Sequence, residues 1–461
     1  MNEEIAEYYE ELYRLYIDEN QPLERRYRQL RESLERVVRE RIQGNSLQTT
    51  DLAARINYVA TQYELDIKEQ NQLHTFRLTS NDILNHRKFP AKEEFLRDLR
   101  AVAFAYRKMF AQDIPLKLFS VLPKQEITSL GKKEKKEYIR RIRVCFDYAD
   151  DTYLYVHPVD IIADEPIRVV YNKPGINHEF EETIKELWRY AQLNLLDVFV
   201  DREGIYTPSF IVLEPDYLID ISSLAECYKD YGSHPANYFL SRLVPIDNAR
   251  PLLLGNIANL FLDEWIHAGE EEPDYIDCMK KAFRQYPIEL AACAELRDPS
   301  KEKEFAKDCR MHFEHIRDIV QHTFLEPGYN LDKKDAVLEP SYICEALGIQ
   351  GRLDYMQRDM SSFIEMKSGK ADEFSIQGKV EPKENNKVQM LLYMAVLEYS
   401  MGQDRRRMHP YLLYTRYPLL YPARASWAQV RRVINLRNRI VAAEYGVQFH
   451  NHSDFTRNLL A

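Results

Sequence analysis

The sequence predicts an α/β protein, α+β overall, in which a mixed sheet flanked by helices follows a helical and mixed α/β N-terminal region. Residues 362–367 alternate polar and apolar side chains with the period of two that is typical of a strand. Residues 388–396 instead repeat apolar side chains at helical spacing. The 461 residues allow two or three domains with sizeable cores.

Residues 1–200 contain two of the three predicted domains. Residues 1–44 repeat apolar side chains on both sides of Pro22, which predicts two helices in a hairpin or a short coiled coil. These helices either pack on the chain's own body or form an arm that docks a partner. Residues 45–200 are predicted to form a mixed α/β domain whose role the sequence does not indicate. Within it we expect a helix at 95–109, strands at 138–146, 152–157 and 167–171, and a helical segment at 178–199.

Residues 205–461 form the third predicted domain. Its opening segment, Phe210–Leu224, is expected to be a strand followed by a helix that is capped near Ser222. Further helices are expected at 254–263, 270–324 and 427–445, and further strands at 336–340 and 409–417.

Two carboxylates are expected to meet in this third domain. Ile349–Met356 is apolar-rich and follows a glycine, which predicts a strand that carries Asp354, while Glu365 lies on the next strand. Two carboxylates held together by rigid strands repel each other unless a cation lies between them, and Mg²⁺ or Mn²⁺ prefers such oxygen ligands. Lys367 shares a face with Glu365 and could stabilise charge on a phosphate or help to deprotonate an attacking water. A divalent cation, the two carboxylates and the lysine together predict a site for phosphodiester hydrolysis.

Three motifs, in this order, resemble those of the PD-(D/E)XK nuclease superfamily in its RecB-like branch. Gly351–Asp354 reads G-R-L-D, Glu365–Lys367 reads E-M-K, and Gln389–Tyr393 reads Q-M-L-L-Y. Residues 205–450 are similar to the nuclease domain of helicase–nucleases that process flaps in replication and repair. The resemblance implies a restriction-endonuclease-like core. The alternative is an ordinary amphipathic hairpin and helix with a surface ion pair.

The resemblance implies a role for each motif residue. The implied ligands of Mg²⁺ or Mn²⁺ are Asp354, Glu365 and the backbone carbonyl of Met366. Lys367 would act on the attacking water or on the charged phosphorane. Gln389 and Tyr393 would position either the site or the DNA strand.

The histidine that binds metal in this family is replaced here. Leu254–Asp263 resembles the family's helix G-x-x-x-H-E-L-L, with Asn259 at the position of the histidine. Asn259 is therefore a tentative metal ligand, and the alternative is that it only caps or packs within its helix. His312 and His315 form an H-x-x-H pair that could ligate a metal, although a core or solvated role is favoured. His315 remains an outside candidate to replace the missing histidine.

A net charge of −10 implies that any nucleic-acid groove must concentrate its own basic residues. The tentative DNA-binding residues lie in the loop that enters the Q-x-x-x-Y helix, namely Lys370, Lys379, Lys383 and Lys387. They either contact DNA or form a solvated loop beside Glu381 and Glu384. A second basic run, at 132–136, could contact a phosphate backbone but is favoured as a solvated face.

The cysteines limit the cofactors. None of the six forms C-x-x-C, which indicates a reduced, cytoplasmic chain without a disulfide framework. Many relatives carry an iron–sulfur cluster that needs three cysteines after the Q-x-x-x-Y helix. None follows Cys344, so no cluster is expected, and Cys227 is expected to be a small buried residue. No apolar run reaches the roughly eighteen residues of a membrane span, and no phosphate-loop motif is present.

The expected function is a divalent-metal-dependent DNA nuclease that acts on single-stranded ends or flaps in DNA repair, replication or defence. A helicase or ATPase partner is implied, because the relatives are often fused to one and this sequence has no phosphate loop. The alternative is a catalytically weak or inactive DNA-binding or scaffolding subunit that keeps the nuclease fold. Asn259 motivates this alternative, whereas the presence of Asp354, Glu365 and Lys367 argues against it.

Overall fold

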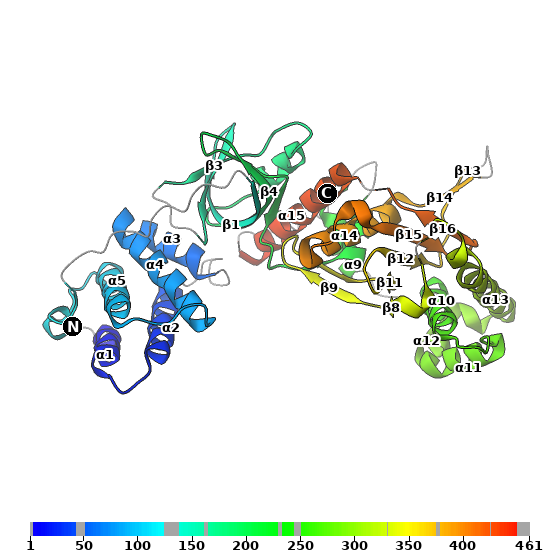
Figure 1. Cartoon of the computed structure of the whole chain (residues 1–461), viewed down its shortest axis with the longest axis horizontal. Helices are drawn as coiled ribbons and strands as arrows, with labels where there is room; N and C mark the ends of the chain where they lie inside the picture. The colour runs from blue at the N-terminus through cyan, green and yellow to red at the C-terminus, as the bar shows by residue number, and fades with distance from the viewer. Residues whose placement is uncertain are drawn as a thin grey trace. The chain divides into compact units, whose positions relative to one another are not determined.

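The computed structural model describes residues 3–42, 51–123, 138–160, 165–228, 233–243, 250–329, 331–374, 379–424 and 426–449. The chain divides into two compact units. Unit 1 comprises Met1–Glu214 with Val441–Ala461, and unit 2 comprises Pro215–Ile440. The α/β class is confirmed, since both units combine helices with mixed sheets (Figure 1).

Unit 1 begins with helices that share one hydrophobic core. They are α1 (Glu3–Ile17), α2 (Leu23–Arg41), α3 (Leu52–Gln62), α4 (Ile67–Leu84), α5 (Lys92–Phe110) and α6 (Leu116–Phe119). The two expected N-terminal helices are confirmed, with Pro22 as the residue before α2. Tyr27 of α2 stacks with Phe76 of α4 and packs edge-on to Phe95 of α5. The apolar side of α2 is thus used by the chain's own core, which it shares with residues of α3, α4 and α5, while the expected boundary at residue 44 lies outside the described residues.

The second part of unit 1 is a small barrel. Its elements are β1 (Tyr138–Ala149), β2 (Tyr153–Pro158), β3 (Ile167–Val170), η2 (His178–Phe180), α7 (Glu181–Lys185), β4 (Gln192–Val200), β5 (Tyr206–Thr207) and β6 (Phe210–Leu213). Strand order β1-β2-β3-β5-β4 closes into a ring, because β1 also pairs with β4, and β6 continues along β4 (Figure 1). The three expected strands up to residue 171 are confirmed.

The expected helical segment at 178–199 is wrong in its second half. Only η2 and α7 are helical, and Gln192–Val200 is strand β4. Side chains on both faces of β4 are mostly buried, and both edges of the strand are paired, with β1 on one edge and with β5 and β6 on the other. Burial on both faces removes the alternation that marks a half-exposed strand, so the apolar run looked helical.

Unit 2 contains two sheets of three and five strands and a small hairpin. The three-stranded sheet has the order β7-β10-β9, and the five-stranded sheet has the order β16-β15-β12-β11-β8. The strands are β7 (Ile219–Asp220), β8 (Ala336–Leu338), β9 (Ser341–Cys344), β10 (Ile349–Arg352), β11 (Tyr355–Gln357), β12 (Ser362–Lys367), β13 (Asp372–Phe374), β14 (Lys379–Glu381), β15 (His409–Tyr414) and β16 (Leu419–Pro422).

The helices of unit 2 pack around the five-stranded sheet. They are α8 (Ile221–Cys227), α9 (Ala236–Leu243), α10 (Arg250–His267), α11 (Tyr275–Gln285), α12 (Pro287–Ala292), α13 (Pro299–Gln321), α14 (Glu384–Met401) and α15 (Trp427–Phe449), the last of which passes on into unit 1. Short 3₁₀ turns lie at η3 (Ala294–Arg297), η4 (Thr323–Leu325), η5 (Lys333–Asp335) and η6 (Arg405–Arg407). Side chains of α10 and α13 form one core with Ile364 and Met366 of β12. Among the helices of the described residues, none is long and apolar enough to cross a membrane.

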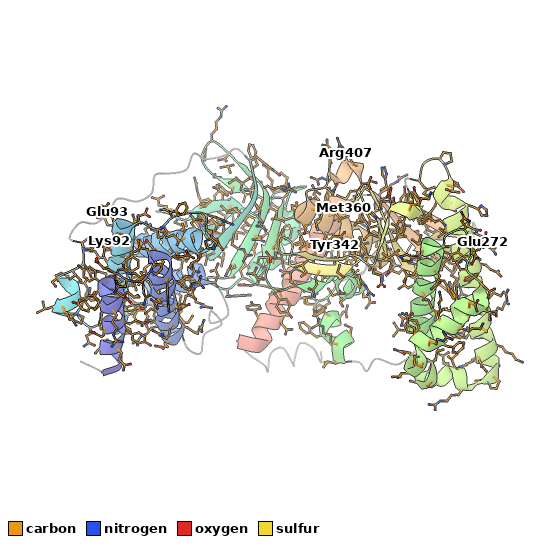
Figure 2. All side chains as sticks on the ribbon, turned by 60° about the horizontal axis from the view of Figure 1, so that its bottom comes forward. Lys92, Glu93, Glu272, Tyr342, Met360 and Arg407 are labelled. Carbon is orange, nitrogen blue, oxygen red and sulfur yellow. The ribbon has the colours of Figure 1, made fainter. Side chains whose placement is uncertain are left out.

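The segment that follows α10 is hydrogen-bonded to the end of α13. Glu272, which is labelled in Figure 2, accepts a hydrogen bond of 2.8 Å from Gln321 at the end of α13. In the same view Tyr342 and Met360 lie on the sheet side of this unit. The hydroxyl of Tyr342 contacts the sulfur of Met356 at 2.9 Å, which ties β9 to β11.

One local expectation in unit 2 needs correction. Ile349–Met356 is not one strand, because it splits into β10 and β11 at Leu353–Asp354 and the two halves belong to different sheets. The helix expected after Phe210 with a cap near Ser222 is confirmed. Its cap is Asp220, whose carboxylate accepts from the backbone N–H of Ser223 at 3.0 Å.

Candidate active site

The hairpin of β11 and β12 places Asp354 beside Glu365. The two strands are antiparallel, with Tyr355 opposite Ile364, so the preceding and following residues face each other at the end of β11. The backbone N–H of Met366 donates to Asp354 Oδ2 at 2.6 Å. The expected meeting of the two carboxylates on neighbouring strands is thus confirmed, and the strand break at Asp354 frees its side chain from the regular pleat.

Glu365 accepts hydrogen bonds from two side chains on one oxygen, and its other oxygen is unused. Lys367 Nζ donates to Glu365 Oε1 at 2.9 Å, and Gln389 Nε2 of α14 donates to the same oxygen at 2.5 Å. Gln389 Nε2 also lies 3.0 Å from the Ser222 hydroxyl of α8. Glu365 is only 5 % exposed, and its Oε2 has no hydrogen-bond partner among the described residues. A buried carboxylate oxygen without a partner is costly, so this atom indicates a missing ligand.

The charges at the hairpin do not balance. Burial raises the pKa of both Asp354 and Glu365, and the negative charge of Asp354 raises the pKa of Glu365 further. Burial alone would lower the pKa of Lys367, but attraction to Glu365 and Asp354 raises it instead. When both carboxyls are ionised, two negative charges share one ammonium, and a bound cation would offset the excess and take the place of the proton that the raised pKa values favour.

The residues at the hairpin fit a divalent cation of the Mg²⁺ type. Such ions bind through one or two carboxylates and complete their shell with waters and substrate phosphate. Glu365 Oε2 is unpaired, and Asp354 Oδ1 accepts no hydrogen bond from the described residues. No group of three or more His, Cys, Asp or Glu gathers as a metal cage within the described ranges. The donor set is therefore that of a two-carboxylate site, with the carbonyl of Met366 on the same strand.

Tyr393 and Gly351 fit against each other at the break between β10 and β11. A Cβ added at Gly351 would lie 3.0 Å from the Tyr393 hydroxyl, closer than ordinary packing allows. That hydroxyl donates to the Arg352 carbonyl at 2.6 Å. Tyr393 is fully buried, and its hydroxyl holds the backbone that leads to Asp354.

The structure places Asn259 on a helix that crosses behind β12. Apolar residues of α10 pack with Ile364 and Met366, which point to the opposite side of β12 from Glu365. Asn259 is half-buried, and its side chain makes no hydrogen bond to the described residues. Asp263 lies one turn after Asn259 on the same edge of α10. Burial and the charges of Glu339 and Asp354 raise the pKa of Asp263 to about 6, so this side chain interacts electrostatically with the hairpin.

Four residues near the hairpin were missed by sequence reasoning. They are Ser222 and Glu226 of α8, Asp263 of α10 and Glu339 after β8. Glu339 donates its backbone N–H to the Asp354 carbonyl at 3.1 Å and forms an ion pair with Arg352 at 3.1 Å. A signal existed for Asp263, since it lies one helical turn after Asn259 in the stretch that resembles the family helix.

The expected basic loop is only partly described. Lys370 and Lys383 are exposed, and the backbone N–H of Lys383 donates to the Tyr414 hydroxyl at 3.1 Å. The ammonium of Lys387 pairs with Glu384 at 3.5 Å. The side chain of Lys379 and the basic run at 132–136 lie outside the described residues. DNA binding by these lysines stays a prediction.

The histidines of α13 occupy two different environments. His312 is fully buried, and burial lowers its pKa to about 4, which confirms the favoured core role. His315 Nδ1 lies 3.0 Å from the carbonyl of Thr415, the residue after β15. Cys227 is buried with 3 % exposure, as expected.

Comparison of the sequence with protein-family models finds no match, and comparison with curated proteins finds none either.

Proposed function

We propose that unit 2 is a divalent-metal-dependent DNA nuclease that hydrolyses phosphodiester bonds. The observation that carries the proposal is the joint placement of Asp354, Glu365 and Lys367 with one buried, unpaired oxygen on Glu365. A hydrolase site needs a cation binder and a positive group for the phosphate within one short hairpin. Asp354 and Glu365 would hold Mg²⁺ or Mn²⁺, and such an ion supplies Lewis-acid stabilisation of phosphate charge and an activated water.

The remaining chemistry belongs to the chain's own side chains. Lys367 carries an ammonium that is a quarter exposed, so it can donate to a phosphate oxygen while it keeps its bond to Glu365. Gln389, which is hydrogen-bonded to both Glu365 and Ser222, fixes the rotamer of the carboxylate. Tyr393 fixes the backbone before Asp354. Gln389 and Tyr393 are therefore positioning residues.

Single-stranded ends or flaps are the proposed substrates, and a helicase or ATPase is the proposed partner. Both follow from the resemblance of residues 205–450 to flap-processing helicase–nucleases and from the lack of a phosphate-loop motif in the sequence. Repair, replication or defence would supply such ends.

An inactive DNA-binding or scaffolding subunit is the second candidate. The observation that favours it is Asn259, which stands where the family helix has a histidine. The unpaired oxygen of Glu365 counts against it, because a chain without metal chemistry gains nothing from an unsatisfied buried carboxylate.

Incubation of plasmid and single-stranded DNA with the purified protein separates the two candidates. We expect degradation with Mn²⁺ or Mg²⁺ that stops when EDTA is added. DNA that binds but stays intact with both metals would favour the scaffold. Asp359→Asn is a matched control, because Asp359 is an exposed carboxylate in the turn of the same hairpin, and asparagine keeps the cap on Ser361.

A further inference from the structure

The barrel of unit 1 has a ring of five strands with a helix between its third and fourth strands. β1, β2, β3, β5 and β4 pair in that order and close on β1, with β3 parallel to β5 and the other neighbours antiparallel. Helix α7 lies between β3 and β4. Five-stranded Greek-key barrels of this kind bind oligonucleotides or oligosaccharides across the face of their second and third strands.

That face carries aromatic side chains in cross-strand register. Tyr148 of β1 lies opposite Tyr155 of β2, and Tyr155 lies opposite Arg168 of β3. The rings of Tyr148 and Tyr155 stack with centroids 4.2 Å apart at an interplanar angle of 13°. Tyr153, two residues before Tyr155, shares its face and meets its ring edge-on. We call Tyr148, Tyr153, Tyr155 and Arg168 the aromatic platform.

The platform is exposed and held in one geometry. Tyr148 is 50 % exposed, and Tyr153 and Tyr155 are half-buried. The Tyr155 hydroxyl donates to Asp150 Oδ2 at 2.9 Å, and Asp150 in turn accepts from the backbone N–H groups of Thr152 and Tyr153. The rings are therefore fixed before any ligand arrives, so little side-chain entropy is lost on binding.

The platform carries one cation, Arg168, beside the Asp150 carboxylate that accepts from the Tyr155 hydroxyl. The Arg168 guanidinium lies 5.6 Å from the centre of the Tyr153 ring, is exposed, and forms no ion pair with the described residues. Nearby, Asp147 forms an ion pair with Arg189 at 2.9 Å, and His157 Nε2 lies 3.3 Å from its other oxygen. An unpaired guanidinium beside stacked rings offers a phosphate contact next to base-stacking surfaces, which is the combination that holds single strands.

We propose that the aromatic platform binds single-stranded DNA by stacking a base on the outer face of the Tyr148–Tyr155 pair and by contact of a phosphate with Arg168. The choice of DNA over RNA rests on the nuclease function proposed for unit 2, whereas the single-strand preference rests on the platform alone. Bases in a duplex have their faces covered by their neighbours, so a stacking platform favours single strands. A sugar polymer would gain nothing from the unpaired cation.

Fluorescence anisotropy of a labelled oligothymidylate with the full chain tests this proposal, in EDTA so that no cleavage occurs. Replacing both Tyr148 and Tyr155 with alanine is expected to raise Kd by about 10-fold or more. The logarithm of the binding constant falls as the logarithm of the salt concentration rises. Arg168→Ala is expected to make this dependence less steep by roughly 0.7, the value for one phosphate contact of a single strand. Tyr148→Phe keeps the ring and should bind as wild type does.

Phe89→Ala is the matched control, because Phe89 is 95 % exposed in the turn between α4 and α5, away from the platform. The proposal is overturned if the double alanine variant binds within about 2-fold of wild type, or if Phe89→Ala loses as much affinity. It is also overturned if duplex DNA or RNA of the same length binds more tightly. A chain that binds through the platform but never cuts DNA would refute only the nuclease function of unit 2.

Discussion

Replacing Asp354 with asparagine should stabilise the metal-free protein above neutral pH and remove most of its stabilisation by divalent cations. The amide oxygen can still accept from the Met366 N–H, which now bonds Oδ2 at 2.6 Å. The change removes one of two carboxylates, so Glu365 and Lys367 remain as a balanced pair at 2.9 Å. A site that is tuned for a cation is expected to destabilise the fold when the cation is absent.

The sign follows from the direction of the pKa shift. Burial raises the pKa of Asp354, so the folded state holds its proton to a higher pH than the unfolded chain does. The free energy of unfolding of wild type therefore falls as pH rises through that raised pKa. The asparagine variant has no carboxyl at this position and does not undergo this loss of stability. At about pH 4 the two proteins should match. Above neutral pH the asparagine variant should be more stable by about 1–3 kcal/mol, or roughly 2–12 °C for a unit of this size.

Thermal unfolding in EDTA and in Mg²⁺, at acid, neutral and alkaline pH, measures both effects. At a Mg²⁺ concentration of 100 times Kd, wild type gains about 2.7 kcal/mol, which reverses the order of the two proteins. Asp359→Asn should behave as wild type throughout. A wild type that is more stable than the variant in alkaline EDTA would refute the charge imbalance. An equal Mg²⁺ shift in both proteins would refute the assignment of Asp354 as a ligand.

Three further changes test separate features of unit 2. Gly348→Ala should lower the free energy of unfolding by about 2–4 kcal/mol, because Gly348 has φ +64° and its new Cβ would overlap the buried Arg437 guanidinium. Gly369→Ala has open space and should change it by less than about 1 kcal/mol in the same urea titration. Asn259→His should leave the preference between Mn²⁺ and Mg²⁺ unchanged in a metal titration of cleavage, because α10 packs on the face of β12 opposite Glu365; a raised affinity for Mn²⁺, which imidazole favours, would instead place this position in the metal shell. His312→Leu should reduce the loss of stability between pH 7 and pH 4.5, because the pKa of His312 is lowered to about 4, so the unfolded chain takes up the proton first as pH falls. Equal losses of thermal stability in His312→Leu and wild type would show that His312 titrates normally.

The hairpin of β11 and β12 could be predicted because its signals are local. A period of two over Ser362–Lys367 and a helical repeat through Gln389 each follow from a few adjacent side chains. The close fit of Gly351 under Tyr393 gives a physical reason for a glycine and a tyrosine at these two motif positions, which the sequence pattern alone does not explain.

What the sequence could not supply depends on partners distant in the chain. Strand β4 looked helical because side chains on both of its faces are buried, so the alternation of a half-exposed strand is missing. Asp263 was missed because helical spacing shows which residues share one edge of α10 but not that this edge lies near Glu339 and Asp354. The side-chain contact between Gln389 and Ser222 joins residues 167 positions apart, beyond any local pattern.

Single-turnover cleavage of a labelled single-stranded oligonucleotide with Mn²⁺ tests the proposed chemistry most directly. Wild type is compared with Asp354→Asn, Glu365→Gln, Lys367→Met and the control Asp359→Asn. We predict that the first three each lower the rate by about 100-fold or more, while the control cleaves as wild type does. Cleavage that survives EDTA, or a wild-type rate in any of the three site variants, would contradict a hydrolytic site built on Asp354, Glu365 and Lys367.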